Sequence, residues 1–147
     1  MSEALPSAVI YTDGACHPNP GPGGWSALMI YSGTEKVMSG HADRTTNNRM
    51  ELTAAVQALE ALPGPMKVVL YTDSTYLQRG ISEWLPKWME RNWRTTSGKV
   101  ANLDLWQALT SAAARHQVNW RWLRGHAGDR NNTRVDLLAR QAIKKLK

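Results

Sequence analysis

Apolar residues along the chain alternate with polar ones in some stretches and recur at helical spacing in others. The first pattern predicts strands over residues 8–13, 24–32, 36–42, 67–73 and 118–123. The second predicts helices over residues 47–62, 74–80, 82–90, 103–115 and from 132 onward, with a polar connection over 91–102.

The connections between these elements predict how the strands pair. Short links join the first three strands, which suits antiparallel neighbours, whereas a helix precedes strand 67–73 and favours parallel pairing with the first strand. The expected fold class is α/β, with a mixed five-stranded sheet of three antiparallel strands plus two parallel ones, flanked by helices.

Two of the predicted strands deliver an aspartate where they end. Residues 9–14 are Val-Ile-Tyr-Thr-Asp-Gly, and residues 69–74 are Val-Leu-Tyr-Thr-Asp-Ser. If these strands are parallel neighbours, Asp13 and Asp73 emerge at the same edge of the sheet. Close carboxylates repel each other unless a cation lies between them, and Mg²⁺ prefers oxygen ligands. Each motif alone is equally typical of a solvated turn, so the matched pair is what favours a divalent metal site.

Three further residues are candidates for the same site. Glu51 lies in the first turns of helix 47–62, and Asp136 lies one turn inside the last helix among apolar residues. The alternatives are an ordinary helix-surface glutamate and an acid that complements the helix dipole. His126 lies between glycines, where a mobile imidazole can transfer a proton, although an exposed loop histidine is the alternative. Four acids supply about the number of oxygens that a two-metal site needs.

Composition and charge indicate the class of binding partner and the cellular location. The 147 residues suit one domain over 1–147, and a net charge of +6 favours a polyanionic partner. The chain has no signal-peptide pattern and no apolar run long enough to cross a membrane. Its single cysteine, Cys16, excludes an internal disulfide and a zinc set. We therefore expect a cytoplasmic monomer with no membrane partner.

Six blocks of sequence, in order along nearly the whole chain, resemble type I ribonuclease H of the bacterial ribonuclease HI kind. They are YTDGAC at 11–16, NPGPGGW at 19–25, TTNNRMEL at 45–52, TDS at 72–74, WRWLRGHAG at 120–128 and VDLLAR at 135–140. The resemblance implies an endonuclease that hydrolyses the RNA strand of RNA–DNA hybrids by a two-metal-ion mechanism, giving 5′-phosphate and 3′-hydroxyl ends. It also implies two Mg²⁺ per active site, with Mn²⁺ as a substitute.

The same resemblance assigns roles to individual residues. It implies that Asp13, Glu51, Asp73 and Asp136 bind the metal and that His126 is an auxiliary catalytic histidine. Glu51 also matches a position that accepts a hydrogen bond from a 2′-hydroxyl, which only RNA offers. Further positions match contacts with the minor groove, the DNA strand or a DNA phosphate: Gly14, Cys16, Asn19, Arg44, Thr46, Asn47, Asn48 and Thr75. Thr75 and Thr133 depart from the usual glutamine and glutamate, which leaves the minor-groove contact of Thr75 in doubt.

A tryptophan-rich stretch at 84–94 resembles the basic handle of the family. Its substrate-binding candidates, with one lysine that follows, are Trp84, Lys87, Trp88, Arg91, Trp93, Arg94 and Lys99. Met89 and Glu90 replace lysines of well-known bacterial members, so we expect weaker or more salt-sensitive hybrid binding.

The tryptophans divide into two predicted groups. Of Trp84 and Trp88, which share a helical face, one is expected to be exposed and the other packed. The other three are expected in the core: Trp106, Trp120 and Trp122.

Two alternative functions use parts of the same evidence. A metal-dependent DNA nuclease of the same superfamily predicts loss of the groove residues Cys16, Asn19 and Asn47, and extra DNA-binding domains. A non-catalytic hybrid-binding module predicts loss of at least one of the four acids. Neither loss is found in the sequence, so hybrid cleavage is the favoured interpretation.

Overall fold

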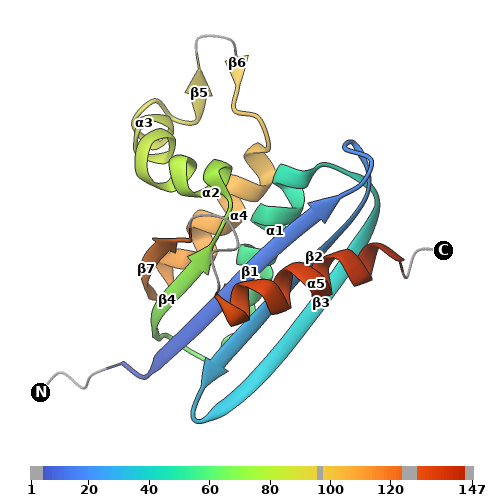
Figure 1. The fold of residues 1–147 in the computed structure, drawn as a ribbon. Coiled ribbons are helices and arrows are strands. Elements are labelled where there is room, and N and C mark those ends of the chain that lie inside the picture. Colours follow the sequence, from blue (N-terminus) through green and yellow to red (C-terminus); the bar gives the residue numbers. More distant parts are fainter. Residues whose placement is uncertain (1–4, 96–97, 124–128, 145–147) are drawn as a thin grey trace, which may run out of the picture.

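The computed structural model describes residues 5–95, 98–123 and 129–144. Its main sheet has five strands in the order β3-β2-β1-β4-β7 (Figure 1). The strands are β1 (Ser7–Cys16), β2 (Gly21–Tyr31), β3 (Thr34–Thr45), β4 (Lys67–Thr72) and β7 (Gln117–Trp122). β1 and β3 lie antiparallel to β2, whereas β4 lies parallel to β1 and to β7. The predicted fold class is confirmed.

Turn chemistry joins β2 to β3 as the sequence predicts. Ser32 and Gly33 have φ angles of 54° and 71°, and they form the two-residue link of the hairpin. Two successive positive φ angles match the right-handed twist of the paired strands, so the register of this hairpin is fixed by its turn.

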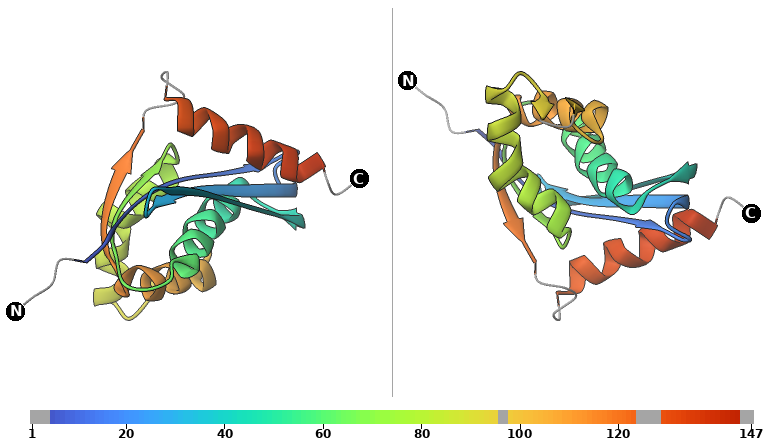
Figure 2. Two further views of the ribbon diagram at one scale, coloured as in Figure 1. Left: turned by 90° about the horizontal axis from the view of Figure 1, so that it is seen from below. Right: turned by 90° about the horizontal axis from the view of Figure 1, so that it is seen from above.

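Helices cover the two faces of the sheet unequally (Figure 2). α5 (Arg130–Lys144) lies alone against one face, over β1 and β2. The other face carries α1 (Asn47–Ala61), α2 (Thr75–Arg79), the π-helical turn η1 (Gly80–Trp84), α3 (Leu85–Glu90) and α4 (Leu103–Ala114). None of the helices in the described ranges combines the length and apolar character needed to span a membrane.

The main core lies between the sheet and α1 and α4. Ile10, Leu70, Leu59 and Trp106 are completely buried there. The predicted core position of Trp106 is confirmed, and Gly80 allows it, because a Cβ on Gly80 would overlap the indole ring. Burial of this apolar surface is what holds α1 and α4 on the sheet.

Two predictions about tryptophans are wrong. Trp122 is 40% exposed, because it lies at the end of the edge strand β7, and its Nε1 donates to the carbonyl oxygen of Asp73 at 3.3 Å. Trp84 and Trp88 are both half-buried and packed against the core, with ring centroids 5.9 Å apart. Trp120 is half-buried against the core, closer to its prediction.

Some boundaries also differ from the predicted ones. β1 continues to Cys16 because its residues beyond Asp13 still pair with β2. α2, η1 and α3 follow one another without a break, and the stretch predicted as a connection contains a small hairpin of β5 (Arg94–Thr95) and β6 (Gly98–Lys99). Figure 1 shows α3 and this hairpin projecting away from the main sheet.

Candidate active site

The register of β1 against β4 brings the two strand aspartates together. Tyr11 pairs with Tyr71 at the end of the parallel ladder, and their rings stack with centroids 4.8 Å apart. Continuing this register by two residues places Asp13 opposite Asp73, at the carboxyl ends of the strands. β4 ends at Thr72, so Asp73 directly follows it.

Glu51 joins these aspartates because α1 approaches β1 very closely at Gly14. A Cβ on Gly14 would overlap the backbone nitrogen of Glu51 and lie 2.5 Å from the carbonyl carbon of Met50. The helix begins at its cap, Thr46, whose Oγ1 accepts a hydrogen bond from Arg49 N at 3.2 Å. One ligand oxygen from each of the three acids, Asp13, Glu51 and Asp73, lies within 4.8 Å of the others.

Asp136 reaches the group from the opposite face of the sheet, on α5. Gly24 of β2 lets the helix approach, because a Cβ there would overlap the carbonyl oxygen of Ala139. Ser26, which pairs with Asp13 across β1 and β2, donates its hydroxyl to the carbonyl oxygen of Val135 at 2.5 Å. The side chain of Asp136 lies close enough to Asp13 for the two acids to interact, and it forms an ion pair with Arg140. α5 begins at Arg130, so Asp136 lies deeper in the helix than predicted.

Burial and mutual repulsion disfavour the charged forms of two of these acids. Burial, then the charges of Asp73 and Asp136, raises the pKa of Asp13 to about 8. Burial, then the charges of Asp13 and Asp73, raises the pKa of Glu51 well above its usual value. Glu51 Oε1 is buried without a hydrogen-bond partner among the described residues.

These observations fit a bound divalent cation. A cation would neutralise the repelling carboxylates and would give the orphaned Glu51 oxygen a partner. The donors are all carboxylate oxygens, which suit Mg²⁺ or Mn²⁺ and not a soft metal. The geometry therefore supports a metal-dependent reaction at this edge of the sheet.

Three residues that contact the site were not predicted from the sequence. Asn132 is 1% exposed, and its Nδ2 lies 3.5 Å from Asp73 Oδ2. Ser26 holds α5, and Trp122 binds the backbone of Asp73. A serine inside the apolar stretch 25–30 was a usable signal for Ser26, whereas nothing local distinguishes Asn132 from a helix-cap asparagine.

Several predicted substrate residues lie together beside the acids. The backbone N–H of Asn47 donates to Asn19 Oδ1 at 3.2 Å, and Cys16 Sγ lies 3.4 Å from the carbonyl oxygen of Thr45. Arg44, Asn48 and Thr75 are exposed, as a contact with substrate requires. His126 and the side chain of Lys99 lie outside the part of the chain that the structure describes.

The handle, defined here as residues 84–95, separates its aromatic and basic groups. Its three tryptophans, Trp84, Trp88 and Trp93, pack against the core. Lys87, Arg91 and Arg94 are exposed, and so is Glu90. The projecting handle therefore offers cations to a partner while its aromatic rings attach it to the domain.

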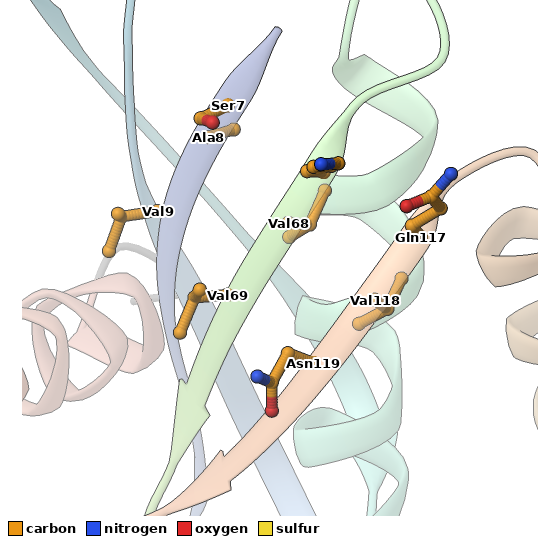
Figure 3. Close-up of a pocket in the computed structure, with 9 residues that line it drawn as sticks. Ser7, Ala8, Val9, Val68, Val69, Gln117, Val118 and Asn119 are labelled. Atoms are coloured by element: carbon orange, nitrogen blue, oxygen red, sulfur yellow. The ribbon is translucent and has the colours of Figure 1, made fainter. Parts of the chain in front are cut away.

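A large hollow lies away from the acids. It has a volume of about 480 Å³ and lies over the first residues of β1, β4 and β7, lined among others by Val9, Val69 and Asn119 (Figure 3). Asp13 and Asp73 lie toward the opposite, carboxyl-terminal ends of β1 and β4. This hollow is therefore separate from the site of the predicted chemistry.

Removing the Ser26 hydroxyl tests how α5 is positioned. We expect Ser26→Ala to leave the Val135 carbonyl without its second donor, to lower the free energy of unfolding by about 1 kcal/mol and to weaken metal binding through Asp136. Chemical denaturation measures the change in the free energy of unfolding, and the dependence of activity on Mg²⁺ concentration measures the change in metal binding. Ser39→Ala is the control, because Ser39 pairs with Ser26 from β3. Equal effects in both variants would contradict this role for Ser26.

The family model and the similar proteins all indicate the same protein family. The family model described as RNase H matches residues 6–144. A protein of Granulibacter bethesdensis named "Ribonuclease H" is 61% identical over 134 residues, which cover 90% of this chain and 89% of that protein. One of Pseudomonas aeruginosa named "Ribonuclease HI" is 56% identical over 139 residues, 94% of each chain.

Solved structures show the same fold. LC9-RNase H1, described as a type 1 RNase H with the type 2 active-site motif, superposes with a TM-score of 0.89 at 33% identity, covering 100% of this chain and 76% of that one. LC11-RNase H1, solved in complex with an RNA/DNA hybrid, superposes with a TM-score of 0.72 at 23% identity, covering 95% and 98%.

Proposed function

Because this chain belongs to the ribonuclease H family, we propose that its acid cluster is the active site of an endonuclease that hydrolyses the RNA strand of RNA–DNA hybrids. The observation that carries the proposal is the meeting of Asp13, Glu51 and Asp73 within 4.8 Å, with Asp136 against Asp13. Nothing in the four acids departs from the pattern that the resemblance requires.

Each acid has a distinct place in the proposed metal site. Asp13 interacts with each of the other three acids, so it is the central ligand. Glu51 and Asp73 flank it, and Asp136 completes the set from the other face of the sheet. Two divalent ions bound here, Mg²⁺ or Mn²⁺, would generate the attacking hydroxide and stabilise the leaving 3′ oxygen.

Three residues that contact the acids or their backbone hold these ligands in place before any substrate arrives. Asn132 donates toward Asp73, Trp122 binds the Asp73 backbone, and Ser26 fixes the turn of α5 that carries Asp136. Fixing ligands in this way limits the reorganisation that metal binding requires. His126, which precedes α5, is proposed to move a proton during or after cleavage.

Strand choice is proposed to depend on the 2′-hydroxyl of RNA. Glu51 is the proposed acceptor for this hydroxyl. Asn47 begins α1, one turn before Glu51, and its backbone N–H is hydrogen-bonded to Asn19. Gly14, which is buried under α1, and Cys16 lie two residues apart on β1 and are further proposed contacts with the hybrid. DNA lacks the donor, so it would bind without the contact that favours cleavage.

The handle is proposed to bind the phosphates of the hybrid. We expect Arg91→Ala with Arg94→Ala to weaken hybrid binding and to reduce the slope of log affinity against log salt by about one unit per cation removed. Fluorescence anisotropy in EDTA measures binding without cleavage. Lys36→Ala removes a cation from β3 and is expected to change little. A slope unchanged by the handle variant would exclude these phosphate contacts.

A cleavage assay on four duplexes tests the proposed function. Both strands of RNA–DNA, DNA–DNA and RNA–RNA duplexes, and of a hybrid with 2′-O-methyl RNA, are end-labelled and incubated with the full chain and Mg²⁺. We expect the chain, acting as a single-domain monomer, to cut only the RNA strand of the plain hybrid. Cutting of the DNA duplex would identify a DNA nuclease, and binding of the hybrid without cutting in Mg²⁺ or Mn²⁺ would identify a binding module.

A further inference from the structure

An arginine forms an ion pair with one of the four acids, Asp136, which is unexpected for a metal ligand. Asp136 and Arg140 are four residues apart on α5, and Arg140 Nη2 contacts Asp136 Oδ2. The acid precedes the base by one turn, which is the favourable orientation for such a pair. The Asp136 side chain is 18% exposed and that of Arg140 is 62% exposed, so the pair lies at the rim of the site.

The pair has consequences for a cation that must bind Asp136. One oxygen of Asp136 is occupied by the guanidinium, and Asp136 also lies close enough to Asp13 for the two acids to interact. A divalent ion that uses this oxygen must first displace Arg140, and it then binds beside a positive charge.

We propose that Arg140 is a positioning residue that occupies Asp136 in the metal-free protein and lowers the affinity of the site for divalent ions. The inference rests on the proposed function, because it takes Asp136 to be a metal ligand. It goes beyond that function in assigning a residue outside the acid set a part in setting metal affinity. Arg140 is well exposed at the rim, so its displacement from Asp136 would not bury its charge.

The chain provides a matched control on the same helix. Arg134 lies two residues before Asp136, but its guanidinium reaches Glu35 of β3 at 3.2 and 3.3 Å. Arg134→Gln and Arg140→Gln therefore remove the same charge from α5 and differ in the partner that each leaves. Both side chains are at least partly exposed, so neither variant is expected to prevent folding.

The test is a calorimetric titration of the metal-free protein with Mn²⁺, without substrate. We expect Arg140→Gln to lower the dissociation constant about two- to fivefold, and Arg134→Gln to leave it unchanged. The thermal midpoint of Arg140→Gln should also rise more on adding Mn²⁺ than that of the parent chain, because tighter binding stabilises the folded state more. An equal shift in both variants, or weaker binding by Arg140→Gln, would overturn the inference.

Asp136→Asn separates failure of this inference from failure of the proposed function. If Asp136 is a ligand, this variant binds Mn²⁺ more weakly than the parent chain. Weaker binding by Asp136→Asn together with identical behaviour of the two arginine variants would reject only the role of Arg140. Unchanged binding by Asp136→Asn would reject Asp136 as a ligand, and the inference with it.

Discussion

The Asp13→Asn variant is expected to unfold at a higher temperature than the parent chain when both are kept free of metal at neutral pH. Asp13 is 4% exposed and lies beside Glu51, Asp73 and Asp136, so at neutral pH it is mostly protonated in the folded protein, and folding must take up a proton that the unfolded chain has released. The uncharged amide keeps the size of the side chain and folds without taking up a proton. We expect a gain of about 2–5 kcal/mol in the free energy of unfolding.

The pH dependence of stability identifies the cause of this gain. Burial and the neighbouring acids raise the pKa of Asp13 from 3.8 to about 8 in the folded protein, so the folded state binds a proton that the unfolded chain has released. Stability is therefore greatest below about pH 4 for this group and falls as the pH rises toward 8. Asp13→Asn should show a smaller fall over this range.

Thermal melts from pH 4 to 8 in EDTA measure the effect. Asp43→Asn is the control, because Asp43 is an exposed residue of β3. It should follow the parent chain at every pH. Saturating Mg²⁺ should reverse the order, since the parent chain then gains the binding energy that the variant loses. A parent chain that becomes more stable as the pH rises, with no gain in Asp13→Asn, would contradict the arrangement of the acids.

The Gly14→Ala variant is expected to lose both stability and activity. The added methyl would overlap the backbone of α1 at Met50 and Glu51, and backbone cannot rotate away as a side chain can. We expect a loss of about 3 kcal/mol in the free energy of unfolding. Moving Glu51 by about 1 Å should also cost on the order of 10²-fold in cleavage rate.

Gly64→Ala is the matched control for this substitution. A Cβ on Gly64 meets no atom within 4 Å, and Gly64 has no positive φ, so the same chemical change has nothing to displace. Denaturant unfolding and hybrid cleavage should therefore leave Gly64→Ala close to the parent chain. A Gly14→Ala variant with the parent's stability and rate would show that α1 does not depend on this close approach.

Element order and type were predictable because the sequence patterns are local. Alternation predicted the strands, and helical spacing predicted helix starts at residues 47 and 74, directly after Thr46 and at Ser74, the caps that the structure shows. The position of Asp13 relative to Asp73 was also predictable, since both follow the same run of residues in paired strands. Such features depend on residues that are close in the sequence and on the register of paired strands, and both can be inferred from sequence patterns.

Contacts between distant elements were not predictable in the same way. The exposure of Trp122 follows from the place of β7 at the sheet edge, although its alternation with Arg121 suggested a buried face. Trp84 and Trp88 both pack inward because the continuous helical segment from α2 through α3 carries Trp88 against Trp106 and Trp84 against Tyr76. The ion pair of Arg140 and the approach of Asn132 to Asp73 likewise depend on how α5 settles against the sheet.

The most direct test of the central claim is the rate of RNA-strand cleavage in a labelled hybrid as Mg²⁺ is raised from zero. It is measured for the parent chain and for Asp13→Asn after both are shown to be folded. We expect no cutting without the metal, a rate that saturates with Mg²⁺ in the parent chain, and a loss of about 10³-fold or more in Asp13→Asn at every concentration. Equal Mg²⁺-dependent rates in the two proteins would contradict the assignment of catalysis to this acid cluster.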